Sequence, residues 1–276
     1  MIKTLTSANS TEIRADNSRT AYSQIFGYDV FGNRYYRQTE NPNNPVSQSW
    51  TETADINLAK NRFAANITYD EQGNVKIDYK FRQRQFEYDA NGRQKRSVAL
   101  DGSSGEERTV YDGLDQRVAN TIGQLVRHSV YDAFGKMIAE YENVAPPSQP
   151  QTKYLLTDKN GAVRVTTNAQ GNVVSRQDYA AFGEEIYAGV GQRTTAHGFN
   201  ANANIRHGFN SLEQDEAIGL THTQWRKYDS SSGRWTTPDP YDGSISAANP
   251  QSYNRYNYVE NDPANMIDTF GLSPYG

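Results

Sequence analysis

Few residues of this chain have the types and spacing that catalysis or metal binding requires. The chain has no cysteine, which excludes thiol nucleophiles, disulfides and zinc–thiolate sites. It has no G-x-S-x-G motif for a serine nucleophile, and Gly189-Val190-Gly191 lacks the third glycine of a dinucleotide-binding loop. No H-x-x-x-H or H-E-x-x-H spacing occurs among the four histidines, which are His128, His197, His207 and His222. We therefore expect neither a metal nor a cofactor.

Two aspartates, Asp239 and Asp268, are the remaining candidates for chemistry. Two carboxyl groups held close together cannot both ionise, so one can act as a base while the other acts as an acid. Asp239 stands before a proline, however, and an aspartate in that position commonly caps a turn. The residue types and spacing alone leave both interpretations open.

The charges exclude several classes of partner. The 28 Lys and Arg and the 32 Asp and Glu are interspersed, and the formal net charge is −4. Neither a basic face for nucleic acid nor an attraction to anionic membranes is expected. No apolar run reaches the 18 residues or so of a membrane span, and the first residues, MIKTLTSANSTEIRADNS, lack the apolar stretch of a signal peptide.

The composition favours an extended or hollow β architecture. The mean hydropathy of −0.86 is low for a chain that must bury a core. Yet 19 Tyr, 10 Phe and 3 Trp make the chain 12% aromatic, and disordered segments are poor in aromatic residues. A sheet with two exposed faces reconciles these two facts, since it needs less purely apolar sequence.

A repeat of about 20 residues dominates the sequence. Each unit has a Tyr-Asp pair, a turn that contains glycine and a polar strand, as in YDVFGNRYYRQ, YDEQGNVKIDY, YDANGRQKRSV and YDAFGKMIAEY. The pairs are Tyr28-Asp29, Tyr69-Asp70, Tyr88-Asp89, Tyr111-Asp112 and Tyr131-Asp132. After the last pair, turns follow at Asn160-Gly161, Gly171-Asn172 and Phe182-Gly183.

The unit is typical of an antiparallel β-hairpin. Val75, Ile77 and Tyr79 alternate with Lys76 and Asp78, which is the two-residue period of a strand. The glycine supplies the positive φ of a tight turn, and the aspartate is expected to accept hydrogen bonds from turn amides. Because a single hairpin is marginally stable, each unit must stack on its neighbours.

The prolines divide the chain into three segments. None of the ten lies between residues 46 and 145 or between 151 and 237, and proline cannot donate to a β-ladder. We expect a YD-repeat region over residues 1–141 with an irregular N-terminus, a proline-rich hairpin tip or linker over 142–152, and a second region over 153–276 that ends irregularly.

At this point the sequence resembles the rearrangement-hotspot (RHS) and YD-repeat proteins, specifically their C-terminal repeat-associated core. The resemblance rests on YLLTDKNGAVRVTTNAQGNVVSRQDYAAFGEE (154–185), NSLEQDEAIGLTHTQWRKYDSSSGRWTTPDP (210–240) and NRYNYVENDPANMIDTFGL (254–272). Together with the upstream repeats it spans roughly residues 22–272. Thr269 stands where the family has a proline, and Thr221, His222 and Thr223 replace a Tyr- or Phe-rich stretch.

The resemblance implies an all-β fold in which antiparallel hairpins form part of a large curved sheet or shell. In bacterial relatives the shell holds a C-terminal toxin or effector, and these polymorphic toxins are secreted or displayed on the cell surface. In several relatives the core resembles an aspartyl autoprotease that cuts after a Gly-Leu pair. The chain would then be an enzyme only in the sense of a single self-cleavage.

Carried over to this sequence, the resemblance makes Asp239 and Asp268 the catalytic pair and places the cut between Leu272 and Ser273. Arg234 is a lesser candidate, whose guanidinium would lower the pKa of one carboxyl; a structural pairing is the alternative for it. Cleavage would release only Ser273–Gly276, so this chain would lack a cargo.

Two other functions remain open at this stage. The chain can be a secreted or cell-surface binding module for carbohydrate or protein partners, or an orphan fragment without a function of its own. Five to seven hairpins leave open strand edges, which pair readily with other chains. We therefore expect the partner to be an upstream YD-repeat chain or a second copy of this one.

Overall fold

The computed structural model describes residues 7–13, 19–38, 55–103, 105–144, 152–199, 206–215 and 217–272. This part of the chain consists of β-strands and short 3-10 helices, which confirms the predicted all-β class. None of its helices is long and apolar enough to cross a membrane. The N-terminal strands are β1 (Ser7–Ile13), β2 (Arg19–Tyr28), β3 (Arg34–Gln38), β4 (Ile56–Asn57) and β5 (Arg62–Phe63).

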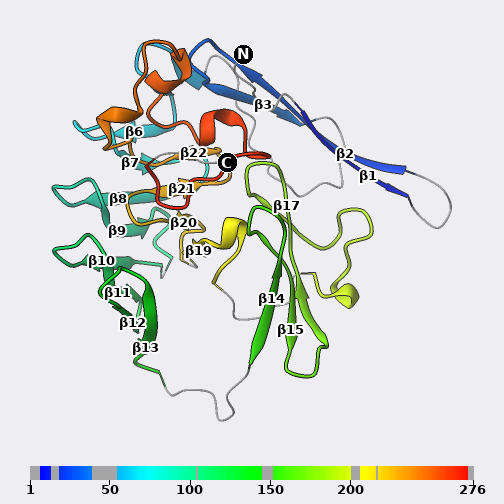
Figure 1. Cartoon of the computed structure of the whole chain (residues 1–276). Helices are drawn as coiled ribbons and strands as arrows, with labels where there is room; N and C mark the ends of the chain where they lie inside the picture. The colour runs from blue at the N-terminus through cyan, green and yellow to red at the C-terminus, as the bar shows by residue number, and fades with distance from the viewer. Residues whose placement is uncertain are drawn as a thin grey trace.

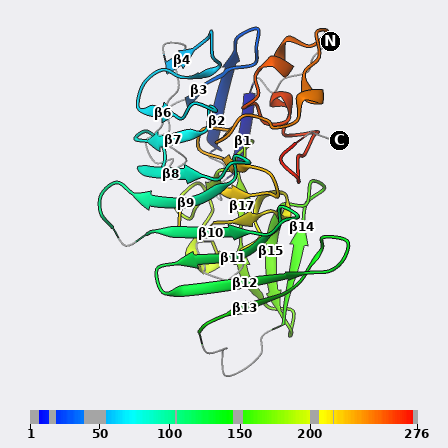
Figure 2. The ribbon, with the colours of Figure 1, turned by 90° about the vertical axis from the view of Figure 1, so that its left-hand side faces the viewer.

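An eight-stranded antiparallel sheet is the largest element, and its strands follow one another in chain order (Figures 1 and 2). Each strand pairs with the next along the chain, as stacked hairpins require. The strands are β6 (Ile67–Tyr69), β7 (Val75–Asp78), β8 (Arg84–Tyr88), β9 (Gln94–Ala99), β10 (Glu107–Tyr111), β11 (Arg117–Ile122), β12 (Leu125–Tyr131) and β13 (Met137–Glu142).

The aspartate of each YD pair closes the hairpin turn as predicted. Oδ1 of Asp89, for example, accepts hydrogen bonds from the backbone N–H groups of Asn91 and Arg93, both at 3.0 Å. The N–H of Gly92, which has a φ of +76°, donates to the carbonyl of Asp89. Only glycine adopts this backbone conformation at little cost, which explains its place in the repeat. The same aspartate-to-amide bonds recur at Asp29, Asp70, Asp112, Asp132 and Asp158.

The tyrosine of the pair ties its strand to the preceding hairpin. The hydroxyl of Tyr88 donates to the carbonyl of Val75 at 2.9 Å, and that of Tyr111 donates to the carbonyl of Gln94 at 3.2 Å.

One detail of the predicted alternation was wrong: Asp78 is buried and Tyr79 is half exposed. The strand ends at Asp78, whose carboxylate turns inward to accept the backbone N–H groups of the following turn.

Three smaller sheets follow the large sheet along the chain: β14–β16, β17–β18 and the four-stranded sheet β19–β22. The four-stranded sheet lies between the large sheet and the β14–β16 sheet (Figures 1 and 2). The first two of these sheets contain β14 (Lys153–Thr157), β15 (Val163–Asn168), β16 (Val173–Arg176), β17 (Asp178–Tyr179) and β18 (Glu185–Ile186). The four-stranded sheet contains β19 (Glu213–Gln214), β20 (Thr221–His222), β21 (Lys227–Asp229) and β22 (Arg234–Trp235). The 3-10 helices are η2 (Thr195–His197), η3 (Phe209–Ser211), η4 (Asp242–Ser244), η5 (Pro250–Tyr253) and η6 (Val259–Asn261).

The two main hydrophobic clusters each join distant parts of the chain. One packs Phe63 and Phe86 of the YD repeats against Ile218 and Leu220 of the four-stranded sheet region. The other contains Phe26, Ala162, Phe182, Phe209, Tyr228, Trp235, Tyr258 and Val259. The interior also holds many buried charged and amide side chains, so the low mean hydropathy reflects paired polar groups inside the molecule as well as exposed sheet faces.

The domain boundaries drawn from the sequence stay a prediction. The large sheet ends at Glu142 and the next strand begins at Lys153, while most of the proline-rich segment, residues 145–151, lies outside the described residues.

Candidate functional site

Asp239 and Asp268 come together around one buried arginine, Arg226. Arg226 directly precedes β21, Asp239 lies in the loop after β22, and Asp268 lies in the irregular segment after η6. Nη2 of Arg226 is 3.3 Å from Oδ2 of Asp239 and 3.5 Å from Oδ2 of Asp268. The side chains of all three are at most 8% exposed, so the two carboxyls share a single cation in a largely dry environment.

Backbone hydrogen bonds fix the second oxygen of each carboxyl. Oδ1 of Asp268 accepts the N–H groups of Gly271 at 2.7 Å and Leu272 at 3.2 Å, so this aspartate caps the turn that leads into the expected cleavage site. Oδ1 of Asp239 accepts the N–H of Tyr241 at 2.9 Å. Thus each aspartate caps a turn with one oxygen and faces Arg226 with the other.

The guanidinium of Arg226 is held from several sides. Its Nε donates to the carbonyl of Gly271 at 2.5 Å, and its Nη1 donates to the carbonyl of Arg255 at 3.1 Å. The ring of Trp235 packs 4.3 Å from the guanidinium carbon. Arg226 therefore contacts both aspartates and the glycine that precedes Leu272.

Burial sets the protonation of the site. It raises the pKa of Asp239 and of Asp268 above their ordinary value of 3.8, although Arg226 opposes the rise. Burial also lowers the pKa of Arg226 to about 10, against the pull of both carboxylates. Two carboxyls with raised pKa values can hold one proton between them at a less acidic pH than two exposed aspartates.

A small pocket connects these groups with Leu272. It holds about 50 Å³ of water-sized space and is lined by Arg226, Asp239, Asp268 and Leu272, among others. A cavity needs roughly 10–15 Å³ of such space for one water molecule. The pocket thus has room for water beside both carboxyls and the residue before the expected cut. Ser273 lies outside the described residues.

Arg234 does not contact the pair of aspartates. Its Nη1 donates to Asn33 at 3.1 Å, and its Nη2 donates to the carbonyl of Asn61 and to Asn254 at 3.2 Å. The expectation of a guanidinium beside the pair was therefore wrong for this residue, because β22 directs the side chain toward the N-terminal repeats. Arg234 has a structural role instead, and its partners are amide and carbonyl oxygens where the sequence suggested an acidic residue.

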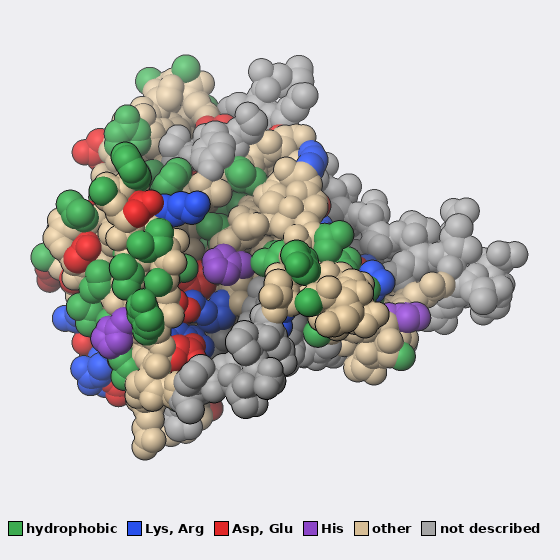
Figure 3. All heavy atoms as spheres, turned by 60° about the horizontal axis from the view of Figure 1, so that its bottom comes forward, with side chains coloured by type: hydrophobic (Ala, Val, Ile, Leu, Met, Phe, Trp, Pro, Cys, Tyr) green, Lys and Arg blue, Asp and Glu red, His purple; other side chains and the backbone are tan. Residues whose placement is uncertain are grey.

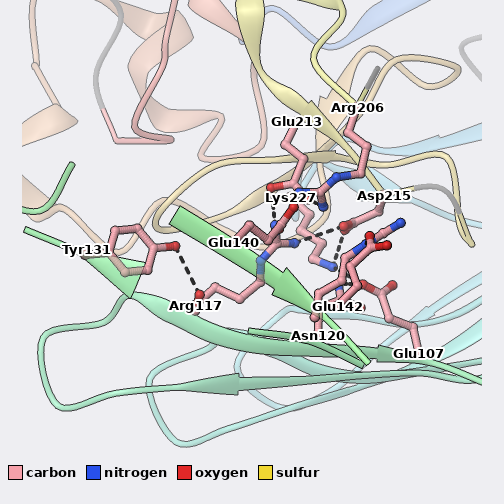
Figure 4. A network of polar contacts seen from close by, with 11 residues as sticks. Glu107, Arg117, Asn120, Tyr131, Glu140, Glu142, Arg206, Glu213, Asp215 and Lys227 are labelled. Atoms are coloured by element: carbon pink, nitrogen blue, oxygen red, sulfur yellow. Dashed lines mark hydrogen bonds and ion pairs between the residues drawn. The ribbon is translucent and has the colours of Figure 1, made fainter. Parts of the chain in front are cut away.

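Sequence reasoning missed two features. One is Arg226, which stands eight positions before Arg234 in the same motif; nothing in the spacing distinguishes which arginine faces the carboxyls. The other is a buried ionic network between the large sheet and the four-stranded sheet (Figure 4). Its members are Glu107, Arg117, Asn120, Glu140, Arg206, Glu213, Asp215 and Lys227. No group of His, Asp or Glu within the described residues is arranged to hold a metal ion.

Comparison with known proteins finds several that are similar to this chain. Residues 147–264 match the family model Teneurin YD-shell. Teneurin-1 of Gallus gallus is 28% identical in an alignment of 262 positions, which covers 79% of this chain and 9% of that protein. Salivary gland surface protein 1 of Aedes aegypti is 26% identical, with 74% of this chain and 6% of that protein covered.

Solved structures share the fold over nearly the whole chain. The Photorhabdus luminescens Tc holotoxin pore gives a TM-score of 0.69 at 16% identity, covering 99% of this chain and 15% of the other. The TcdB2-TccC3 structure gives a TM-score of 0.66 at 16% identity, covering 98% of this chain and 15% of the other. This chain therefore spans under one sixth of the length of each relative. Its motifs, the match over residues 147–264 and its fold support a resemblance to the RHS/YD-repeat shell proteins.

Proposed function

We propose that this chain forms the wall and C-terminal core of an RHS/YD-repeat shell that encloses a C-terminal polypeptide cargo, in relatives a toxin or effector, and that it can cleave itself after Leu272. The observation that carries the proposal is the pocket shared by Asp239, Asp268, Arg226 and Leu272. A site that only capped turns would not need two carboxyls on one buried cation next to that leucine.

The proposed chemistry needs one protonated and one ionised carboxyl. The ionised carboxyl takes a proton from a water molecule as that water attacks the carbonyl carbon of Leu272. The protonated carboxyl donates its proton, which ends on the leaving nitrogen of Ser273. Arg226 keeps the two carboxyls close and, through the carbonyl of Gly271, holds the backbone before the cut. The reaction occurs once per molecule because the product is the enzyme itself.

Intact-mass measurement of the full chain tests the self-cleavage. We expect loss of Ser273–Gly276 on incubation, and we expect Asp239→Asn and Asp268→Asn to slow it by about 100-fold or more, the usual contribution of a general acid or base. Asp242→Asn is the matched control, since its side chain is 91% exposed. Because both pKa values are raised above 3.8, the rate should fall as the pH rises and both carboxyls ionise. A full-length mass after long incubation from pH 4 to 7 would contradict self-cleavage.

A second candidate function is binding to carbohydrate or protein partners at a surface. Hydrophobic side chains gather over the side of the molecule where the large sheet lies (Figure 3). The exposed ones there are Val110, Leu114, Val130, Phe134, Ile138 and Tyr141. Exposed apolar patches of this kind are typical of interaction sites, and one relative is named as a surface protein of the salivary gland. Under both proposals we expect the protein to be secreted or displayed on the cell surface.

Glycan arrays and pull-downs with extracellular protein fractions test this second function. Phe134→Ser combined with Ile138→Ser should abolish the binding, whereas Leu58→Ser, an exposed residue of another segment, should not. No retained ligand for the parent chain would exclude it.

The strand edges support a partner in either case. β13 ends the eight-stranded sheet in the described part of the chain, which leaves its outer backbone groups available for another strand. We propose that an upstream YD-repeat chain or a second copy pairs there.

A further inference from the structure

Lys227, Asp215 and Glu107 form a closed cluster inside the ionic network, and none of them lines the pocket of Asp239 and Asp268. Their side chains are 3%, 1% and 0% exposed. Lys227 comes from β21, Asp215 follows β19 and Glu107 begins β10 of the large sheet, so the cluster joins two sheets (Figure 4). An amine, a carboxyl and a second carboxyl are thereby isolated from bulk water.

The contacts have the arrangement that amide formation needs. Nζ of Lys227 contacts Oδ2 of Asp215 and lies 3.5 Å from Oε1 of Glu107. Nη1 of Arg117 lies 3.1 Å from the other oxygen of Asp215, Oδ1. The nitrogen, which becomes nucleophilic once it loses a proton, therefore touches a carboxyl whose far oxygen faces a fixed positive charge. Such a charge stabilises the oxyanion that forms when a carboxyl carbon is attacked.

Glu107 is suited to carry the protons. Its Oε1 accepts a hydrogen bond of 2.6 Å from Asn120, whereas its Oε2 is buried without a hydrogen-bond partner among the described residues. Burial is the main cause that raises the pKa of Glu107, and the charge of Asp215 adds to it. A neutral carboxyl can give a proton from one oxygen and receive one on the other, as a general acid and base must.

We propose that Lys227 and Asp215 join through an intramolecular isopeptide bond, with Glu107 as proton carrier and Arg117 as oxyanion partner. A proton first moves from Nζ to the carboxylate of Asp215. The nitrogen lone pair then forms a bond with Cγ of Asp215, and the carbonyl electron pair moves to Oδ1 beside Arg117. Glu107 takes the second proton from nitrogen and returns a proton to the Oδ2 hydroxyl, which leaves as water. One C–N bond forms, one C–O bond breaks, and nothing is oxidised or reduced.

The ion pair between Lys227 and Asp215 slows the reaction, because it must first be neutralised by a proton transfer. The charges of Asp215 and Glu107 raise the pKa of Lys227, and Lys227 and Arg117 lower that of Asp215, each against the effect of burial. His222 adds an electrostatic effect that also lowers the pKa of Asp215. The first proton transfer is therefore uphill, and we expect bond formation to follow folding slowly. Close, fixed positioning offsets such a barrier, since effective concentrations in well-oriented pairs far exceed those in solution.

Intact-mass spectrometry of the purified full chain tests the bond. We expect a mass about 18 Da below that of the same polypeptide, one water having left, with the shifted fraction growing during incubation. Trypsin cuts after arginine, so peptide 207–226 should appear joined to peptide 227–234. A mass that stays at the sequence value would overturn the proposal and leave a buried ion pair.

Variants distinguish the isopeptide bond from other reactions that also lower the mass by one water. Succinimide formation at Asp101-Gly102, Asp112-Gly113 or Asp242-Gly243 also removes water, but it would survive in Lys227→Arg, which keeps the positive charge and should abolish the cross-link. Glu107→Gln should slow the reaction by about 100-fold or more. Asp215→Asn provides an independent readout, because the same bond would then release ammonia, about 17 Da. A shift retained in Lys227→Arg would contradict the assignment.

Discussion

At the residue scale, the turn aspartate is the part of the repeat whose role is most directly testable. Oδ1 of Asp112 accepts the N–H groups of Leu114 at 2.8 Å and Gln116 at 2.9 Å. Asp112→Ala should lower the free energy of unfolding by about 1–2 kcal/mol, because two turn amides lose their acceptor. Chemical unfolding measures this.

The chain supplies its own control for that substitution. At the equivalent turn, Oδ1 of Asn168 accepts the N–H groups of Gln170 and Asn172. Asp112→Asn should therefore change stability by less than about 0.5 kcal/mol, as surface substitutions that keep their contacts do. Equal losses for Ala and Asn would show that the side-chain oxygen is not what closes the turn.

At the scale of the elements, the repeat predicts the hairpins, but it does not predict which other elements they pack against. The Tyr-Asp pair and the glycine act within a few residues, so the turns and the order of the large sheet follow from local pattern. By contrast, Arg117 pairs with Glu213 and Asp215, which lie nearly 100 positions later. No local pattern encodes such a contact; it depends on how the four-stranded sheet docks against the large one.

The candidate site shows the same limit. Both aspartates could be named because they belong to recognisable motifs, and the structure brings them together. Their arginine could not be chosen, because the local sequence does not show which of Arg226 and Arg234 faces the carboxyls. Alternation along a strand fails as a guide where strands are only two or three residues long, as β21 and β22 are.

At the scale of the whole molecule, the N-terminal repeats and the C-terminal segment hold each other in place. Arg234 donates to Asn33 and Asn254, and Asn254 also donates to Asn33 at 3.0 Å. All three are buried. Asn261 adds a bond to the carbonyl of Gly32. The chain thus closes on itself through amide groups, and the segment that carries Asp268 is anchored by a hairpin more than 200 positions earlier.

Removal of the Arg234 side chain should destabilise the N-terminal repeats and the C-terminal segment together. Arg234→Ala removes a buried charged donor that Asn33, Asn61 and Asn254 share, and we expect a loss of about 2–4 kcal/mol. Hydrogen exchange should then accelerate over residues 26–34 and 250–262 in parallel, while the strands of the large sheet keep their protection. Arg108→Ala is the control, since this side chain is 62% exposed and its ion pair with Glu106 lies at the surface. Faster exchange near residue 234 alone would mean that the two ends are held independently.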